Sequence, residues 1–459
     1  MATELPTVSG ENFRDREFTP KQIVEELNKY IIGQDEAKRS VAIAIRNRIR
    51  RQHVEGEIKD EIQPKNILMI GPTGVGKTEI SRRLARIASS PFIKVEATKF
   101  TEVGYVGRDV ESMIRDLVDS GINMVRNEEI KRVEDEAKEL VDERILDSLL
   151  PAEGDNQDRS DSIERTREKL RQKLKNGDLD ERYIEIQVEE SKSSQVDIFS
   201  QEGMDQMGID MSDMLSNILP SQKETKRVKI KNAKDIIFDQ EVDKLLNQEE
   251  IRQKGLKLAE ETGIIFLDEI DKIASDDFGE GGGGGPGVSR QGVQRDILPL
   301  LEGSNVRTRY GTLNTENILF ITAGAFTTSK PSDLIPELQG RLPIRVELNN
   351  LGSEEFKEIL TKPKDALIKQ YAALMNVEDI DLDFTDEAID EIAKISAELN
   401  ENTENIGARR LQTVMEKLME ELSYEAPDKA GEKVKITRDY VQEKLEDIVE
   451  DRDLSKYIL

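Results

Sequence analysis

The sequence predicts an α/β fold with a parallel sheet, interrupted by a large, mainly helical insertion and followed by a helical C-terminal domain. Three observations support this prediction. A short apolar strand, residues 66–70, is followed by a glycine-rich turn and a helix, as in a parallel α/β unit. About 165 residues separate the next expected strand, 92–97, from the one at 263–267, whereas a strand–helix–strand unit needs about 30. From about Asn349 the apolar residues follow helical spacing.

The glycine-rich turn fits the pattern G-x-x-x-x-G-K-[ST] of a phosphate-binding loop. It reads Gly71-Pro72-Thr73-Gly74-Val75-Gly76-Lys77-Thr78. Glycines in such a loop allow backbone N–H groups to turn inward and bind an anion at the N-terminus of the following helix. Lys77 is placed to reach the β- and γ-phosphates of a nucleotide, and the Thr78 hydroxyl is placed to bind Mg²⁺. Because a strand and a helix flank the loop, an incidental glycine-rich turn is the weaker interpretation.

A second site follows the strand at 263–267, which ends in two adjacent carboxylates, Asp268 and Glu269. The carboxyl ends of parallel strands line the ligand crevice, so we expect these acids beside the nucleotide. Asp268 suits the coordination shell of Mg²⁺, and Glu269 suits the orientation and deprotonation of an attacking water. An apolar strand before acids is commonly structural. Together with the phosphate loop it predicts hydrolysis rather than binding alone.

The composition argues against several classes of protein. The 459 residues leave room for two or three domains. With 94 acidic and 67 basic residues the net charge is −27, which argues against a nucleic-acid partner. The chain has no cysteine, so disulfides, thiolate metal sites and thiol nucleophiles are excluded. No run of about 18 apolar residues and no apolar signal core are present, so we expect a cytoplasmic protein without membrane attachment.

The insertion contains several helical stretches. Helical spacing begins with Val110, Met113 and Ile114 and continues towards Leu150, and a charged helix is expected over 163–175. Ile184, Ile186 and Val188 alternate as in a strand. Four methionines then follow at helical spacing, and they are interpreted either as ordinary core or as a surface that contacts substrate: Met204, Met207, Met211 and Met214.

Three shorter segments are also candidates. Gly104-Tyr105-Val106-Gly107 is either a buried turn or a mobile loop that grips a ligand. Glu337-Leu338-Gln339-Gly340-Arg341 lies between the expected strands 318–322 and 344–348, where an arginine can stabilise a transferring γ-phosphate of its own or a neighbouring subunit. Gly407-Ala408-Arg409-Arg410 opens an amphipathic helix. The helix dipole makes a positive charge at a helix N-terminus unfavourable, so the two arginines there predict an anionic partner.

In their order along the chain, these motifs resemble the HslU (ClpY) family, the AAA+ unfoldase subunits of the bacterial HslUV (ClpYQ) proteases. The resemblance also includes Ile31-Ile32-Gly33-Gln34 and runs from about Phe18 to Leu459. The chain departs from the family in an N-terminal extension of about fifteen residues and in the run 279–287, which we interpret as an unstructured spacer.

The resemblance implies a fold and a domain division. The fold is a P-loop AAA+ core with a parallel five-stranded sheet and a helical lid. The implied domains are a flexible N-terminal extension (1–17), the first part of the core (18–108), an inserted I domain (109–245), the second part of the core (246–348), and a helical C-terminal domain with a peptidase-docking tail (349–459).

The resemblance also assigns roles in ATP binding and hydrolysis. Ile32 is implied to pack against the adenine, and Asp268 and Glu269 form the Walker B pair. Thr322 is the implied sensor at the end of its strand, Arg409 is the second sensor, and Glu337 and Arg341 face the neighbouring subunit's nucleotide, with Arg341 as the trans finger. The phosphates are held by Gly74, Val75, Gly76, Lys77, Thr78 and Glu79.

The implied activity is ATP-dependent protein unfolding and translocation with Mg²⁺, by a homohexamer without peptidase activity of its own. The ring feeds unfolded or tagged proteins to the HslV (ClpQ) peptidase and activates it. Gly104, Tyr105, Val106 and Gly107 are implied to line the pore. The end of the tail is implied to dock on the peptidase through Leu454, Tyr457, Ile458 and Leu459. The alternative is that the tail packs on its own domain.

Three alternatives stay open at this point. A ClpX-type unfoldase shares the core motifs, but it carries a four-cysteine zinc module and lacks the long insertion. An AAA+ DNA-remodelling motor is disfavoured by the acidic balance and by the aromatic loop around Tyr105. A nucleotide-switched scaffold that barely hydrolyses is disfavoured by Glu269, because such switches often lack that carboxylate.

Overall fold

The computed structural model describes residues 18–59, 61–101, 108–150, 157–189, 223–274 and 290–450. They form two compact units. One consists of the chain up to Met124 together with the chain from Arg252 onward, and the other spans Val125–Ile251. The boundaries fall inside two helices, α4 (Ser112–Leu149) and α9 (Gln248–Thr262). The compact middle unit overlaps the predicted insertion 109–245 without sharing its borders, which stay a prediction.

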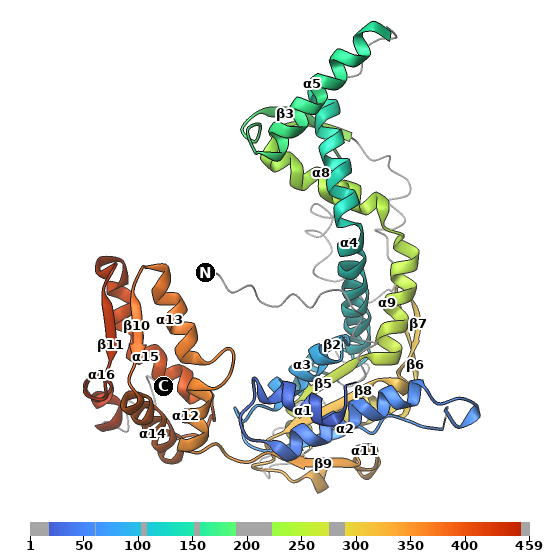
Figure 1. Cartoon of the computed structure of the whole chain (residues 1–459). Helices are drawn as coiled ribbons and strands as arrows, with labels where there is room; N and C mark the ends of the chain where they lie inside the picture. Colours follow the sequence, from blue (N-terminus) through green and yellow to red (C-terminus); the bar gives the residue numbers. More distant parts are fainter. Residues whose placement is uncertain are drawn as a thin grey trace, which may run out of the picture. The chain divides into compact units, whose positions relative to one another are not determined.

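The first unit is built on a five-stranded parallel sheet, of which Figure 1 labels β2, β5, β8 and β9. The strand order is β2-β5-β8-β1-β9. The sheet confirms the predicted α/β class, and every expected strand is present. Strands β5 and β8 are buried along almost their whole length, which explains their continuous apolar sequences. The strands are β1 (Ile67–Ile70), β2 (Phe92–Glu96), β5 (Ile264–Asp268), β8 (Leu319–Gly324) and β9 (Ile344–Glu347).

Three helices pack on one face of this sheet: α1 (Pro20–Asn28), α2 (Asp35–Gln52) and α3 (Lys77–Ile87). Their apolar stripes share one core cluster with the strands, including Ile80 and Leu84 of α3 and Phe266 of β5. Helix α1 begins at a capping box, in which the Thr19 side chain accepts a hydrogen bond from the backbone N–H of Gln22. The stripe on α3 fixes the helix that follows the phosphate loop.

Arg48 of α2 ties this helix to the start of two strands. Its guanidinium donates hydrogen bonds of 2.9 Å to the carbonyl oxygens of Thr262 and Gly263, and a third to that of Asn317. Desolvation by burial, with the charge of Arg51, lowers the pKa of Arg48 to about 9, so the side chain remains a cation at neutral pH. Arg50, two residues further along α2, is exposed and donates a 2.9 Å hydrogen bond to the Asn47 side chain.

The remaining elements between the sheet strands are short. Helix α10 (Arg290–Glu302) and the 3₁₀ turn η4 (Ile270–Ile273) follow β5, and α11 (Pro336–Arg341) precedes β9. A hairpin of β6 (Asn305–Thr308) and β7 (Gly311–Asn314) was not predicted.

The described part of the C-terminal domain, 349–450, contains five α-helices with one shared core. Buried side chains of α14 and α15 form its centre, including Leu411, Val414, Met415 and Leu418 from the predicted stripe. The predicted helical character of this domain is confirmed, and the structure adds two short strands that were not predicted, β10 (Asp381–Phe384) and β11 (Lys433–Ile436), which pair in parallel. The helices are α12 (Ser353–Thr361), α13 (Leu367–Val377), α14 (Asp386–Asn402), α15 (Arg409–Glu425) and α16 (Arg438–Glu450).

The middle unit has a small core of its own. The antiparallel strands β3 (Tyr183–Glu189) and β4 (Lys223–Lys229) pack with α5 (Gln157–Lys175), α8 (Ile230–Leu245) and the second half of α4. Ile184 and Ile186 are buried there, as their alternation predicts. In the ranges described above, no helix is long and apolar enough to cross a membrane.

Several predictions concern segments outside the described residues. These are the N-terminal extension 1–17, the loop with Gly104, Tyr105, Val106 and Gly107, the methionine stripe 204–214, the run 279–287, and the tail with Leu454, Tyr457, Ile458 and Leu459.

Candidate active site

The phosphate loop connects the end of β1 to the start of α3. Gly76 precedes the helix with φ = 101°, and no side chain caps the first turn of α3, whose N–H groups are therefore open to an anion. Gly74 has φ = 76°. Such values are unfavourable for residues with a Cβ, so the two glycines set the shape of the loop.

Lys77 lies within the loop that it belongs to. Its Nζ donates hydrogen bonds to the carbonyl oxygens of Gly71 and, at 2.8 Å, of Pro72. Burial lowers the pKa of Lys77, against the opposing charges of Asp268 and Asp271 and with a further lowering by Arg409. A lysine whose charged form is disfavoured in this way gains from a phosphate, which supplies the missing negative charge.

The predicted acids lie beside this lysine. Asp268 ends β5, and its Oδ2 accepts a hydrogen bond of 3.5 Å from the Thr78 hydroxyl and pairs at 3.0 Å with Nζ of Lys94 from β2. Glu269 has φ = 58°, an uncommon left-handed conformation outside glycine. Its Oε2 accepts a hydrogen bond of 3.1 Å from the Thr98 hydroxyl. The strained turn directs the two adjacent carboxylates to different partners.

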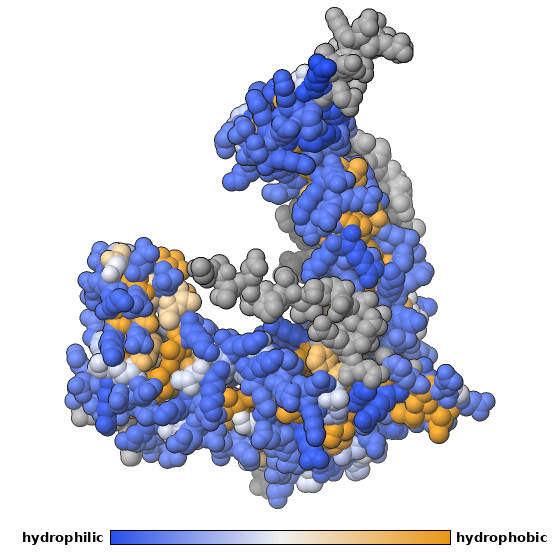
Figure 2. Space-filling view, viewed as in Figure 1, coloured by the Kyte–Doolittle hydropathy of each residue, from blue (hydrophilic) through white to orange (hydrophobic). Residues whose placement is uncertain are grey.

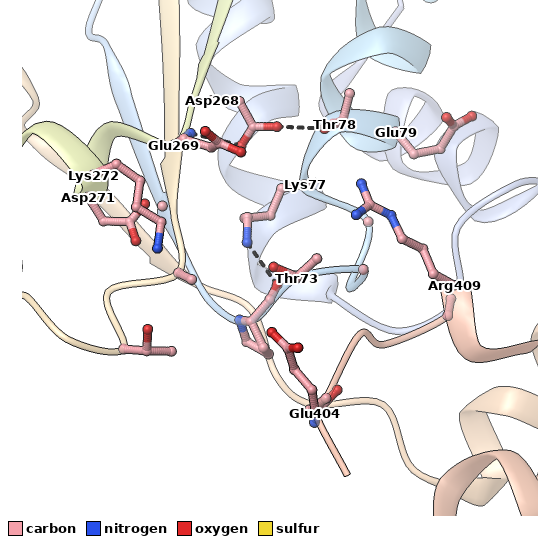
Figure 3. A pocket seen from close by; sticks show the side chains of 18 of the residues that line it. Thr73, Lys77, Thr78, Glu79, Asp268, Glu269, Asp271, Lys272, Glu404 and Arg409 are labelled. Carbon is pink, nitrogen blue, oxygen red and sulfur yellow. Dashed lines mark hydrogen bonds between the residues drawn. The ribbon is translucent and has the colours of Figure 1, made fainter. Parts of the chain in front are cut away.

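A cavity of about 720 Å³ lies among these groups (Figure 3). The phosphate loop forms one wall, and Asp271 and Lys272 of η4 lie opposite Arg409 of the C-terminal domain. The predicted residues that line it are Gly74, Gly76, Lys77, Thr78, Glu79, Asp268, Glu269 and Arg409. The cavity therefore combines a phosphate-binding loop, a hydroxyl–carboxylate pair and three cations, Lys77, Lys272 and Arg409.

The C-terminal domain touches the phosphate loop through its backbone. The N–H of Ala408 donates a 3.0 Å hydrogen bond to the carbonyl oxygen of Gly74. A Cβ on Gly74 would lie 1.9 Å from the carbonyl oxygen of Ile406, and one on Gly407 would lie 2.6 Å from that of Thr73. Only glycine at both positions permits this close approach.

Comparisons with known proteins agree with this geometry. A model of the ATPase family associated with various cellular activities (AAA) matches residues 67–187, and one of the AAA domain (Cdc48 subfamily) matches residues 191–345. Proteins named ATP-dependent protease ATPase subunit HslU from Syntrophomonas wolfei, Oleidesulfovibrio alaskensis and Thermotoga petrophila are 55%, 53% and 52% identical to the chain. Each match covers 96% of this chain and 99% of the relative.

The chain belongs to the HslU family. It is therefore an AAA+ ATPase that binds nucleotide, and neither the ClpX-type nor the DNA-remodelling alternative is favoured by these relatives.

Other predicted HslU residues lie away from the cavity lining. Val75 packs into the core cluster, and the buried Thr322 donates a 3.2 Å hydrogen bond to the carbonyl oxygen of Ile67. Ile32 lies half-buried in the turn between α1 and α2. Glu337 and Arg341 are exposed on α11, where Arg341 pairs at 3.0 Å with Glu302. The roles of these residues stay predictions.

Two contacts of the HslU site were not expected from the sequence. Lys94 gives no sequence signal of its position, because only the pairing of β2 with β5 brings it to Asp268. Arg410 differs from its neighbour Arg409, since it is buried and donates hydrogen bonds of 2.9 Å to the Thr403 hydroxyl and the Glu404 carbonyl oxygen. Its hydrogen bonds stabilise the turn before α15, which contacts Gly74. Arg409 and Arg410 therefore do not form one anion site.

Replacing Gly407 with alanine tests the contact between the domain and the loop. At φ = 59° the new Cβ is strained and meets the Thr73 carbonyl oxygen, so the C-terminal domain must move away from the phosphate loop. We expect the KM for ATP to rise about tenfold, which corresponds to roughly 1.4 kcal/mol. Steady-state ATPase kinetics and binding of a fluorescent nucleotide measure the change.

Gly431→Ala is the matched control. Gly431 lies in the same domain at φ = 84°, but a Cβ there has no neighbour within 4 Å. An alanine at this position has the same kind of backbone strain but does not contact the phosphate loop. Equal KM values for the two variants would show that the contact with Gly74 has no part in nucleotide binding.

Proposed function

We propose that the chain is an ATP-dependent protein unfoldase and translocase that works as a homohexamer with the HslV peptidase. The observation that carries this proposal is the cavity in which the phosphate loop, the Asp268–Glu269 pair and Arg409 meet. Full-length similarity to ATPase subunits of ATP-dependent proteases supports the link to proteolysis.

The residues around the cavity suit distinct tasks in hydrolysis. Lys77 and the N–H groups of the loop bind the β- and γ-phosphates, since both present positive charge into the same space. Glu269 orients a water and accepts its proton, and Arg409 contacts the γ-phosphate from the C-terminal domain. Because Arg409 and the loop lie on different domains, the nucleotide would join them.

Other roles remain proposals by resemblance: Ile32 packs against the adenine and Thr322 acts as a sensor. Glu79 lines the cavity at the start of α3. Burial disfavours its charged form, but hydrogen bonds from Arg83 and Arg82 outweigh this effect, so the pKa of Glu79 is lowered. Glu79 therefore stays an anion that holds these two arginines.

The donor set fits Mg²⁺ bound together with ATP. No group of three or more His, Cys, Asp or Glu side chains able to hold a metal ion occurs in the described parts of the chain. Thr78 and Asp268 do supply a hydroxyl and a carboxylate side by side. Mg²⁺ commonly takes one or two protein oxygens and completes its shell with phosphates and water. When bound, it would offset the phosphate charge.

Arg341 is available to a neighbouring subunit. Its side chain is 44% exposed, and it forms an ion pair with Glu302, whose side chain is 41% exposed. Exposed pairs of this kind contribute about 0–1 kcal/mol, so a phosphate from another subunit can replace Glu302. Glu337 lies exposed on the same helix. This exposure supports a ring in which α11 completes the site of the next subunit.

Apolar side chains on the surface also support association. Leu374 and Val377 of α13 are 59% and 78% exposed, and Figure 2 shows apolar residues gathered over this part of the C-terminal domain. Ile58, which follows α2, is 64% exposed. Exposed apolar patches are typical of subunit contacts.

Three segments are proposed to handle substrate and peptidase, and the pore loop and the tail among them lie outside the described residues. We propose that Gly104 to Gly107 form the pore loop, that the 109–245 insertion is the I domain, and that the last residues dock on HslV. The apolar side chains of Leu454, Tyr457, Ile458 and Leu459 support the last point, because burying them on a partner would stabilise the complex.

The first prediction on this function concerns the ATPase cycle. Lys77→Ala should weaken ATP binding, because Lys77 contacts phosphate in the ground state. Glu269→Gln should leave ATP binding within about twofold but lower kcat at least about 100-fold, since its carboxylate acts on the water in the transition state. Nucleotide binding and ATPase assays measure the two effects. A near-normal rate for Glu269→Gln would contradict the role of this carboxylate.

The second concerns the subunit boundary. Arg341→Ala should lose most ATPase activity and still bind ATP. Mixing it with Lys77→Ala should restore part of the activity, because sites with an intact Lys77 and an intact Arg341 form at mixed boundaries. Glu302→Gln is a control that removes only the resting partner of Arg341 and should remain active. Mixed hexamers without any recovery would rule out a shared site.

The third concerns the peptidase. Deleting the last seven residues should leave the hexamer and basal ATPase intact and abolish stimulation of HslV, whereas a synthetic peptide of that sequence should stimulate HslV partly on its own. Cleavage of a fluorogenic peptide by HslV with MgATP measures both effects. Full stimulation by the truncated chain would disprove docking through the tail.

A further inference from the structure

Gln294 of α10 is a fully buried amide with both ends bonded to the main chain of other segments. Its side chain is 0% exposed. Nε2 donates a 2.6 Å hydrogen bond to the carbonyl oxygen of Ile273, and Oε1 accepts a 2.9 Å hydrogen bond from the N–H of Ile335. One side chain therefore bridges two backbone segments more than 60 residues apart in sequence.

The first of these segments belongs to the nucleotide cavity. Ile273 ends the turn η4, which begins directly after Glu269 and contributes Asp271 and Lys272 to the cavity lining. The turn is also held from its other side, because Asp271 Oδ2 accepts a hydrogen bond from the N–H of Phe326 at 3.3 Å and its carbonyl oxygen accepts one from the Ser329 hydroxyl at 3.2 Å. Hydrogen bonds therefore hold η4 both at Asp271 and at Ile273.

The second segment is the start of α11. Ile335 is the residue before this helix, whose side chains provide no cap for it, so the carboxamide of Gln294 receives one of the N–H groups there. At the other end of α11, Arg341 pairs with Glu302, the last residue of α10. Helix α11 is therefore attached to α10 at both of its ends.

We propose that Gln294 is a positioning residue that couples the Asp268–Glu269 end of a subunit's own site to α11, and so sets where Arg341 stands for the neighbouring site. The inference rests on the proposed action of Arg341 in trans. Gln294 is fully buried and is not part of the cavity lining, so its effect passes through Ile273 on one side and Ile335 on the other.

The amide is suited to this coupling because it is donor and acceptor at once. Methionine has a similar length and fills the same space, but it can neither donate to the Ile273 carbonyl nor properly accept from the Ile335 N–H. Gln294→Met should leave the Kd for ATP within about twofold and lower kcat about fivefold to tenfold, a part of the large contribution that a trans arginine makes.

Mixed rings decide on which side of the subunit boundary Gln294 acts. A Lys77→Ala subunit cannot bind ATP well, but its Gln294 and α11 are intact. In excess over Gln294→Met subunits, it should supply a correctly placed Arg341 to their sites, and turnover per Gln294→Met subunit should rise at least about threefold towards the wild-type value. If Gln294 serves only its own site, the mixture will show no rise, and the proposal is overturned.

Two further variants keep the test decisive. Gln294→Glu keeps the acceptor for the Ile335 N–H but turns a carboxylate oxygen towards the Ile273 carbonyl oxygen, which repels it. This variant should show the same recovery of turnover on mixing with Lys77→Ala. It replaces Gln294→Met in the test if Gln294→Met forms no ring. Gln442→Met makes the same change at an exposed glutamine of α16 and should behave as wild type. Thermal unfolding and sizing confirm that each ring is intact.

The failure of this inference is distinguishable from that of the shared site. If Arg341→Ala and Lys77→Ala do not complement, action in trans is wrong, whatever Gln294 does. If that pair complements but Gln294→Met and Lys77→Ala do not, only the role of Gln294 is wrong.

Discussion

The placement of β8 between β5 and β1 is the constraint on which the rest of the site depends. Thr322 of β8 is paired with Leu68 of β1 on one side and with Leu267 of β5 on the other. The carboxyl ends of β1 and β5 therefore lie at nearly the same height in the sheet. The phosphate loop follows one of them and Asp268 ends the other. Because successive side chains of a strand alternate between the two faces of the sheet, a shift of one strand by one residue would move each of its side chains to the opposite face. The distance between phosphate loop and acids is therefore a property of the sheet.

The second constraint is the backbone contact between the C-terminal domain and the phosphate loop. Gly74 and Gly407 approach so closely that neither tolerates a side chain. Asn400 and Arg410 hold the turn before α15 through its carbonyl groups, and this turn places Arg409 at the cavity. The position of the C-terminal domain is thus linked to the shape of the loop that binds phosphate.

Local patterns predicted the five sheet strands, the stripe on α15 and the phosphate loop, because each is encoded by neighbouring residues. Features that depend on distant partners escaped prediction. Arg48 and Arg50 lie in one basic run, yet only Arg48 is buried, since Thr262, Gly263 and Asn317 supply its acceptors. Strand β10 alternates over only four residues, Asp381–Phe384, too few to stand out among helices.

The cations of the site differ in how firmly the protein holds them, and this difference orders their tasks. Lys77 is buried against backbone carbonyls with a lowered pKa, so a phosphate stabilises its charge and Lys77 suits ground-state binding. Arg341 is half-exposed and held by an exposed carboxylate, so little free energy opposes its transfer to another acceptor. A cation that leaves its resting partner at little cost in free energy is suited to act when a neighbouring nucleotide has bound. What then limits Arg341 is the position of α11, which depends on its attachment to α10.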